Sequence, residues 1–234
     1  MARITKHPLV RREELLDVAF ELCRSHGFEA MSVEQVTQTA GVAKGTFYHY
    51  FDSKADLQEQ LVGRFGESLF NHLTDAIDGV AGDGAQRLGR LMTASAAYKS
   101  GQADLGYASF LYREENFALR HRLYDAWRER ARAVLEPVIA SGVADGSFHV
   151  ADADAATDLV LLLWFDAADH LWKRALEAPD ATAFVQVMTA GGAAISQAQE
   201  RILGVADGTY TLSIPPELIS TIEQFHSRLV RTPA

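Results

Sequence analysis

Short helices separated by glycine turns are the feature of the first sixty residues that most restricts how this chain can fold. Apolar residues recur every three or four positions over 9–26, which predicts an amphipathic helix that ends at Gly27. Ser32, followed three positions later by Gln35, has the capping-box pattern, so a second, short helix is expected to begin here and to end before Gly41. Two tight turns therefore connect the first helices of the chain.

Helical signals continue through the rest of the sequence. The segment "GVAKGTFYHYF" at 41–51 predicts a third helix, and Ser53 with Asp56 predicts the cap of a fourth that runs to about residue 77. Further helices are expected at about 84–100, 104–113, 117–141, 153–177, 180–204 and 216–231. No flexible linker interrupts them. The fold class expected is all-α, a small N-terminal part continuous with a larger helical part.

The composition is that of a folded protein without membrane spans or disulfides. Of the 234 residues, 48% are hydrophobic, which is enough for a packed core. The longest apolar run, "LVLLLWF" at 159–165, is too short to cross a bilayer, and the first residues lack the apolar region of a signal peptide. We therefore expect a cytoplasmic protein. The single cysteine, Cys23, lies among apolar helix positions and is expected to fill the core.

The net charge of −9 argues against a nucleic-acid partner, because Lys and Arg side chains supply most of the non-specific affinity for phosphates. The charge is, however, unevenly distributed: residues 1–55 carry equal numbers of basic and acidic side chains, so the excess of negative charge belongs to the remainder. The first twelve residues contain Arg3, Lys6, Arg11 and Arg12 and no carboxylate. They form either a solvated tail or an arm that follows DNA. Any electrostatic contact with DNA is expected at this end.

Three interpretations of residues 41–51 compete: an aromatic core helix, a phosphate-binding loop, and a helix that reads DNA. A phosphate loop needs the order G-x-x-x-x-G-K-[S/T], whereas here Lys44 precedes Gly45. On a helix, Phe47 and Phe51 share one face, and Gly45 and His49 lie on the opposite face. A core helix explains the phenylalanines but not the other two. Because glycine lets a backbone approach a duplex and histidine can bond base edges, the helix is predicted to read DNA.

The same region resembles a known family. The matching residues are Gly27-Phe28, Ser32-Val33, Val36, "AGVAKGTFYHYF" (40–51), Lys54 and Leu57. They are similar to the N-terminal domain of the TetR/AcrR family of bacterial transcriptional regulators, over about the first 60 residues. The resemblance implies a three-helix helix-turn-helix DNA-binding domain at 1–54, continuous with a helical effector-binding and dimerisation domain at 55–234.

The resemblance also implies which side chains contact a double-stranded DNA operator. Five are expected to face bases: Thr37, Gln38, Gly45, Thr46 and His49. Three are expected to hold phosphates: Lys44, Tyr48 and Lys54. The alternatives are that Thr37 and Gln38 are merely solvated and that Tyr48 chiefly packs. Thr37 and Tyr50 depart from the family's frequent residues, so the operator sequence does not follow.

A second copy of the chain is the next expected partner. One recognition helix buries little surface, so helix-turn-helix proteins usually bind DNA as dimers. The resemblance places the homodimer interface in the helices at about 153–177 and 180–204. The second is rich in small residues, "TAGGAAISQA" at 189–198, which allow helices to approach closely. Packing within one subunit would explain the same composition.

Aromatic residues between positions 65 and 184 are the candidates for the wall of an effector pocket. Aromatic side chains at helical spacing usually belong to a core, but the resemblance implies a ligand cavity in this domain. The expected effector is a small apolar or aromatic molecule. The expected wall consists of Tyr107, Phe110, Trp127, Trp164 and Phe165.

Patterns typical of catalysis or metal binding are missing from the sequence. It contains neither H-E-x-x-H nor G-x-S-x-G, and Asp166 and His170 lie on the polar face of their helix. We therefore expect no cofactor, no metal and no enzymatic activity. The function expected is a dimeric repressor that a small effector releases from a palindromic operator. The alternatives are an activator of the same family, a small-molecule-processing helical enzyme and a protein-binding module.

Overall fold

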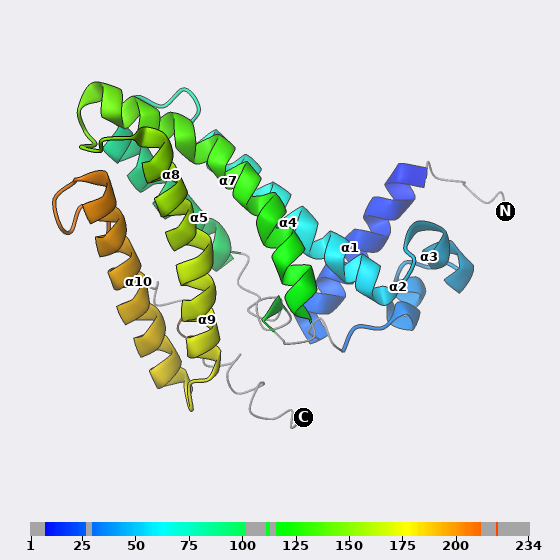
Figure 1. Ribbon diagram of the computed structural model, residues 1–234. Coiled ribbons are helices and arrows are strands. Elements are labelled where there is room, and N and C mark those ends of the chain that lie inside the picture. The colour runs from blue at the N-terminus through cyan, green and yellow to red at the C-terminus, as the bar shows by residue number, and fades with distance from the viewer. Residues whose placement is uncertain (1–7, 27–29, 102–110, 113–115, 212–218, 220–234) are drawn as a thin grey trace. The chain divides into compact units, whose positions relative to one another are not determined.

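The computed structural model describes residues 8–26, 30–101, 111–112, 116–211 and 219 (Figure 1). Within these residues every regular element is a helix, which confirms the predicted all-α class. The chain divides into two compact units. The first comprises Met1–Gly66 with Gly106–Leu119, and the second comprises Glu67–Leu105 with Arg120–Ala234. We call the described residues of the first unit the head and those of the second the body. The predicted boundary between residues 54 and 55 stays a prediction.

The head contains α1 (Pro8–His26), α2 (Val33–Thr39), α3 (Lys44–Tyr50) and the start of α4 (Lys54–Ile77). The predicted capping box is present: the Gln35 backbone N–H donates to Ser32 Oγ, and the Ser32 N–H donates to Gln35 Oε1. Gly41 follows α2 with φ of 65°, a left-handed conformation that favours glycine. The capping box defines the start of α2, and Gly41 allows the sharp turn between α2 and α3.

Apolar side chains hold the helices of the head together. Phe47 and Phe51 are almost completely buried, with ring centroids 5.4 Å apart, as their shared helix face predicted. α2 packs against both α1 and α3. Cys23 is buried and lies in contact with Met31, which confirms its predicted place in the core. Since burying one Phe contributes about 1.5–3 kcal/mol, this small core is enough to fix the orientation of the seven-residue α3.

The body continues α4 and adds α5 (Gly84–Gly101), α7 (Phe117–Asp145), α8 (Ala153–Leu162), α9 (Ala168–Leu176) and α10 (Ala181–Leu203). α10 packs along α9 and α8, as Figure 1 shows. The helices predicted at about 84–100, 117–141 and 180–204 are confirmed. The helices predicted at 104–113 and 216–231 lie almost entirely outside the described residues.

The helix predicted at 153–177 is interrupted by a π-helical turn. Residues Leu163–Ala167, between α8 and α9, form this turn, which we call η2. A π turn inserts one extra residue into a helix and rotates the side chains that follow it. Trp164 and Phe165 both lie in η2, so the turn decides where these two predicted pocket residues point.

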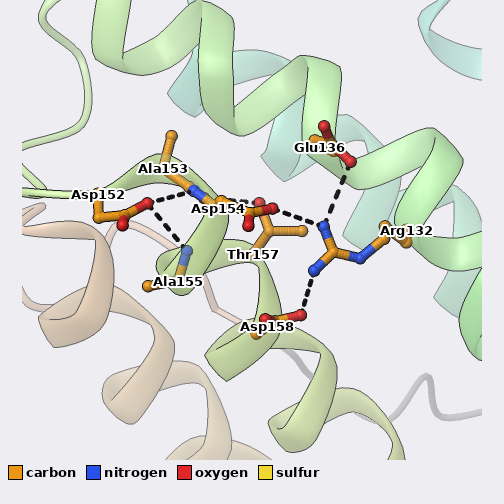
Figure 2. Close-up of polar contacts among 8 residues, drawn as sticks. All are labelled: Arg132, Glu136, Asp152, Ala153, Asp154, Ala155, Thr157 and Asp158. Atoms are coloured by element: carbon orange, nitrogen blue, oxygen red, sulfur yellow. Dashed lines mark hydrogen bonds and ion pairs between the residues drawn. The ribbon is translucent and has the colours of Figure 1, made fainter.

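An arginine joins α7 to the start of α8 (Figure 2). Arg132 donates to Asp154 at 2.8 Å and to Glu136 at 3.3 Å, and it also contacts Asp158. These carboxylates raise the Arg132 pKa, mainly through the hydrogen bond to Asp154. Asp152 caps α8 by accepting from the backbone N–H groups of its first turn. One cation therefore fixes the first turn of α8 against α7.

Candidate nucleic-acid interface

The exposed groups of α2 differ from those that the sequence predicted. Gln38 is exposed, as a base-contacting residue must be. Thr37, in contrast, is only 6% exposed, and its hydroxyl donates to the backbone carbonyls of Val33 and Glu34. Its backbone carbonyl accepts from Val42, across the turn. In this structure Thr37 supports the turn between α2 and α3 and is not presented to a base.

The predicted residues of α3 are largely accessible. Lys44, Gly45 and His49 are exposed, Tyr48 is 50% exposed, and Thr46 is half-buried. Tyr48 rests edge-on against Phe47, with ring centroids 5.3 Å apart, so packing orients the ring while its other side stays accessible. α3 therefore presents a small concentration of hydrogen-bonding groups around a glycine, which is the chemistry that base edges and phosphates require.

Lys44 forms an ion pair that the sequence analysis did not predict. Its Nζ lies 2.5 Å from Glu34 Oε1, and both side chains are more than half exposed. The mutual hydrogen bond lowers the pKa of Glu34 and raises the pKa of Lys44. Glu34 lies in the first turn of α2, and Lys44 begins α3. The two residues are ten positions apart, so the pair depends on the turn between the helices.

Other basic residues of the head also have partners. Arg11 and Arg12 belong to α1 and are therefore not part of a tail, and they pair with Glu14 and Glu13 respectively. Arg12 also lies over the Phe51 ring, 5.8 Å from its centroid. Lys54, a predicted phosphate ligand, is half-buried at the start of α4. The predicted residues Arg3 and Lys6 lie outside the described residues.

A capped short helix, a left-handed glycine and a second short helix with an exposed polar face define a helix-turn-helix DNA-binding protein. The family profile described as "Bacterial regulatory proteins, tetR family" matches residues 15–61. The transcriptional repressor KstR2 of Rhodococcus jostii is 31% identical over 144 residues, which are 59% of this chain and 68% of that relative. The chain belongs to the TetR family of bacterial regulatory proteins. It is accordingly a transcriptional repressor of the helix-turn-helix type and not an enzyme.

Solved structures show the same fold over nearly the whole length. RolR in complex with resorcinol superimposes with a TM-score of 0.61 at 16% identity, over 90% of this chain and 97% of that one. FadR of Bacillus subtilis in complex with stearoyl-CoA gives a TM-score of 0.56 at 18% identity, over 85% and 99% of the two chains. At this identity the likeness establishes the fold. Proteins of this family bind DNA operators and small-molecule ligands.

The predicted effector-pocket residues separate into two groups. Phe165 packs on Tyr124, with ring centroids 5.6 Å apart, and Tyr124 packs on Trp127 at 5.8 Å, so two predicted residues share one aromatic cluster. The Trp164 indole N–H instead donates to Gln199 Oε1 of α10 at 2.7 Å. Tyr107 and Phe110 lie outside the described residues. Successive side chains of a helix point about 100° apart, so neighbouring Trp164 and Phe165 face different surroundings.

An open hollow of about 780 Å³ lies elsewhere in the body. Its lining residues are Ala76, Gln86, Gly89, Arg90, Met92, Thr93, Ala94, Ala97, Thr209, Tyr210 and Thr211. None of the predicted wall residues that the structure describes belongs to it. Gln199 connects this hollow with the predicted wall residue Trp164: its amide N–H donates to Met92 Sδ, and its amide oxygen accepts from the Trp164 indole.

One of the helices predicted to form a dimer, α10, exposes an uncharged surface. Residues 181–199 of α10 contain no charged side chain. The exposed residues of this stretch are Thr182, Gln186, Thr189, Ala190, Ala193, Ala194 and Gln197. On α8, Leu159 and Leu162 are 47% and 50% exposed. Large apolar side chains exposed beside an uncharged helix are typical of surfaces that a protein partner covers.

Asp166 and His170, the one spacing that suggested a polar ligand, do not form a metal site. Asp166 lies 2.9 Å from Arg128, and His170 is exposed. Nowhere in the described part of the chain do three His, Cys, Asp or Glu side chains gather as metal ligands. Among the same residues, no helix combines the length and the apolar character that a membrane span requires.

Proposed function

We propose that this repressor is a cytoplasmic homodimer that binds a palindromic operator through two copies of the head and leaves it when a small apolar or aromatic effector binds the body. The observation that carries the proposal is the exposed polar face of α3 on a helix whose opposite face is fixed by Phe47 and Phe51. A rigid helix is needed because base readout depends on hydrogen-bond geometry.

The proposed contacts follow from exposure and chemistry. Gln38, Thr46 and His49 reach base edges, and Gly45 lets the α3 backbone approach the groove. Three further side chains bind phosphates and set the register: Lys44, Tyr48 and Lys54. Thr37, which the sequence analysis assigned to a base, is left out because its buried hydroxyl already donates within α2.

The proposed dimer places the exposed faces of α8 and α10 against the same faces of a second copy. A two-fold interface is self-complementary, so the uncharged exposed face of α10 avoids opposing like charges. Two heads held in this way read two half-sites about one helical turn apart, which supplies the affinity that one seven-residue α3 lacks.

The effector is proposed to bind beside the aromatic cluster of Trp127 and Phe165. RolR and FadR hold resorcinol and stearoyl-CoA, which contain an aromatic ring and a long apolar chain. Trp164, adjacent to Phe165 in η2, donates a hydrogen bond to Gln199 of α10. A shift of η2 would therefore move α10, the proposed dimer helix. A coupling of about 1–3 kcal/mol would lower operator affinity about 5- to 150-fold, and the operator would weaken effector binding equally.

Selection of bound fragments from random or bacterial DNA by the purified full-length protein tests this proposal. We expect enrichment of a palindrome, one dimer per site, and loss of binding when a suitable apolar or aromatic compound is added. Failure to enrich any duplex would refute the proposed operator binding. Enrichment of a sequence without two-fold symmetry would refute the dimeric arrangement alone.

A further inference from the structure

The ion pair between Glu34 and Lys44 lies on the surface that the proposed function assigns to DNA. Glu34 belongs to the first turn of α2, Lys44 is the first residue of α3, and the two charged atoms are 2.5 Å apart. The Glu34 and Lys44 side chains are 67% and 57% exposed, so both are accessible from solvent.

We propose that Glu34 is an electrostatic brake on DNA binding: it occupies, in the free protein, the Lys44 ammonium that a phosphate must take over in every complex with a duplex. This inference rests on the proposed function, in which Lys44 is a phosphate ligand. The brake adds a residue that opposes DNA binding to a set of predicted DNA-contact residues that all favour it.

The physical basis is competition between two anions for one cation. When a phosphate replaces the carboxylate, the attraction between Glu34 and Lys44 is given up. At 2.5 Å this attraction acts well within the Debye length of about 8 Å at physiological ionic strength, so solvent ions do not fully screen it. The complex therefore loses part of the affinity that Lys44 provides.

A role in holding the fold together is a weaker explanation for this pair. α2 is already fixed by its capping box and by the buried side chains of Val33 and Val36. Exposed ion pairs usually contribute little to stability, because two long side chains must be ordered in water. Removing the Glu34 charge should consequently leave the thermal stability of the head unchanged while it changes DNA binding.

The salt dependence of binding provides a signature that a structural role would not produce. Each phosphate neutralised by Lys or Arg releases counterions and adds about 0.9 to the slope of log K against log[salt]. In the wild-type protein, the Glu34 charge freed on binding attracts a cation again and offsets part of that release. Glu34→Gln removes this offset, so the slope should become steeper by up to about 0.9 per head.

Anisotropy titrations of the full-length protein with a labelled duplex of arbitrary sequence, at several KCl concentrations, test the brake. Four variants are compared with wild type: Glu34→Gln, Lys44→Gln, the double variant, and Glu13→Gln. The last is the matched control, because Glu13 is an exposed carboxylate of the head that pairs with Arg12 and Arg64, neither of them a proposed phosphate ligand.

We expect Glu34→Gln to tighten binding about two- to fivefold per head, the range of exposed ion pairs, with unchanged thermal unfolding. Lys44→Gln should weaken binding and flatten the slope, and the double variant should equal Lys44→Gln, because the brake acts only through Lys44. A gain from Glu13→Gln as large as that from Glu34→Gln would overturn the proposal in favour of net charge. A gain from Glu34→Gln that persists without Lys44 would overturn it in favour of direct repulsion.

Weaker binding by Glu34→Gln would also overturn the brake, because Glu34 would then assist binding. These outcomes are separate from failure of the proposed function. If wild type binds duplexes and Lys44→Gln changes neither affinity nor slope, the assignment of Lys44 to a phosphate is wrong, and the brake is wrong with it. If wild type binds no duplex at all, the operator proposal itself is wrong.

Discussion

Glycines of the recognition helix and glycines of the body have different surroundings. A Cβ added to Gly45 in α3 would meet no heavy atom within 4 Å. A Cβ added to Gly142 in α7 would lie 2.2 Å from Phe148 Cδ2, and one added to Gly191 in α10 would lie 2.2 Å from Leu171 Cδ1. These two body glycines pack closely against neighbours in the same chain. Gly45 of α3 has no such neighbour in the chain, which is consistent with a close approach to a partner outside it.

The same contrast divides the small-residue stretch of α10 into two faces. Gly191 faces Leu171, so close packing within the subunit explains one half of the stretch. Gly192 has no atom within 4 Å of an added Cβ, and Ala193 and Ala194 are exposed. One side of α10 therefore packs within the subunit, and the other, exposed side is available for the proposed dimer.

Ala193→Glu gives the largest effect that this comparison predicts. A carboxylate on the exposed side of α10 would face its own copy across a two-fold interface and would be buried without a partner. We expect monomers in light scattering and a loss of operator affinity of about 100-fold or more, because linked half-site binding is lost.

Ala140→Glu is the matched control for this variant. Ala140 is an exposed alanine of α7, outside the proposed interface, and the change in charge is identical. The control should remain dimeric and bind the operator as wild type does. A dimeric Ala193→Glu protein would show that the second copy docks elsewhere.

Gly45→Ala tests the open glycine of the head. In an exposed helical position, alanine is favoured over glycine by up to about 1 kcal/mol, so the variant should be at least as stable as wild type. The new methyl group would hold the α3 backbone away from the groove and lengthen its hydrogen bonds. We expect operator affinity to fall by about 2 kcal/mol per head, roughly 30-fold.

Gly63→Ala controls for the general effect of replacing a helical glycine in the head. Gly63 lies in α4, and an added Cβ there also meets no atom within 4 Å. This variant should keep full operator affinity in a mobility-shift assay. Equal affinity of Gly45→Ala and wild type would mean that α3 does not approach DNA through this glycine.

Much of the head could be predicted from the sequence, because its signals are local. Ser32 with Gln35 fixed the start of α2, Gly41 fixed its end, and the spacing of Phe47 and Phe51 fixed which side of α3 is buried. The fate of Thr37 could not be predicted in the same way. A threonine hydroxyl can bond the backbone of its own helix or an outside partner, and only burial decides between them.

The body was less predictable because its decisive features are not local. The π turn at 163–167, which contains Trp164 and Phe165, has no glycine or proline to announce it. The three carboxylates around Arg132 come from two helices, so their convergence depends on packing. Periodicity located most of the helices that the structure describes but carried no information about which of their polar residues would meet.

Gly142→Ala tests the closed glycines of the body. Phe148, the residue that an added Cβ would strike, is only 2% exposed, and an aromatic ring cannot bend aside. We expect the free energy of unfolding to fall by about 1–3 kcal/mol, the usual cost of an overpacked core, in urea denaturation. Gly89→Ala is the control, since its Cβ would lie 3.7 Å from Tyr210, an ordinary contact. Equal stability of both variants would mean that α7 and Phe148 can separate at little cost.

The smallest expected effect concerns the carboxylate that secures the same close approach of α5 and α7. Asp145 accepts from the Gly84 N–H and from the Ser147 N–H, both at 2.9 Å, and a Cβ on Gly84 would collide with the Gly142 backbone. The pKa of Asp145 is lowered most by hydrogen bonding to the Ser147 side chain, and it is lowered further by the backbone N–H groups of Ser147 and Gly84.

A lowered carboxylate pKa stabilises the folded state above the unfolded value of about 3.9, and this contribution is lost as the pH falls through the folded value. Asp145→Asn removes the charge and one of the two acceptor oxygens. We expect it to be slightly less stable than wild type in urea at pH 7 and the difference to shrink below about pH 4, as Asp145 is protonated in wild type. Asp78→Asn, the same change at an exposed carboxylate after α4, should match wild type at pH 7. A difference that is constant from pH 7 to pH 3 would show that Asp145 acts through packing and not through its charge.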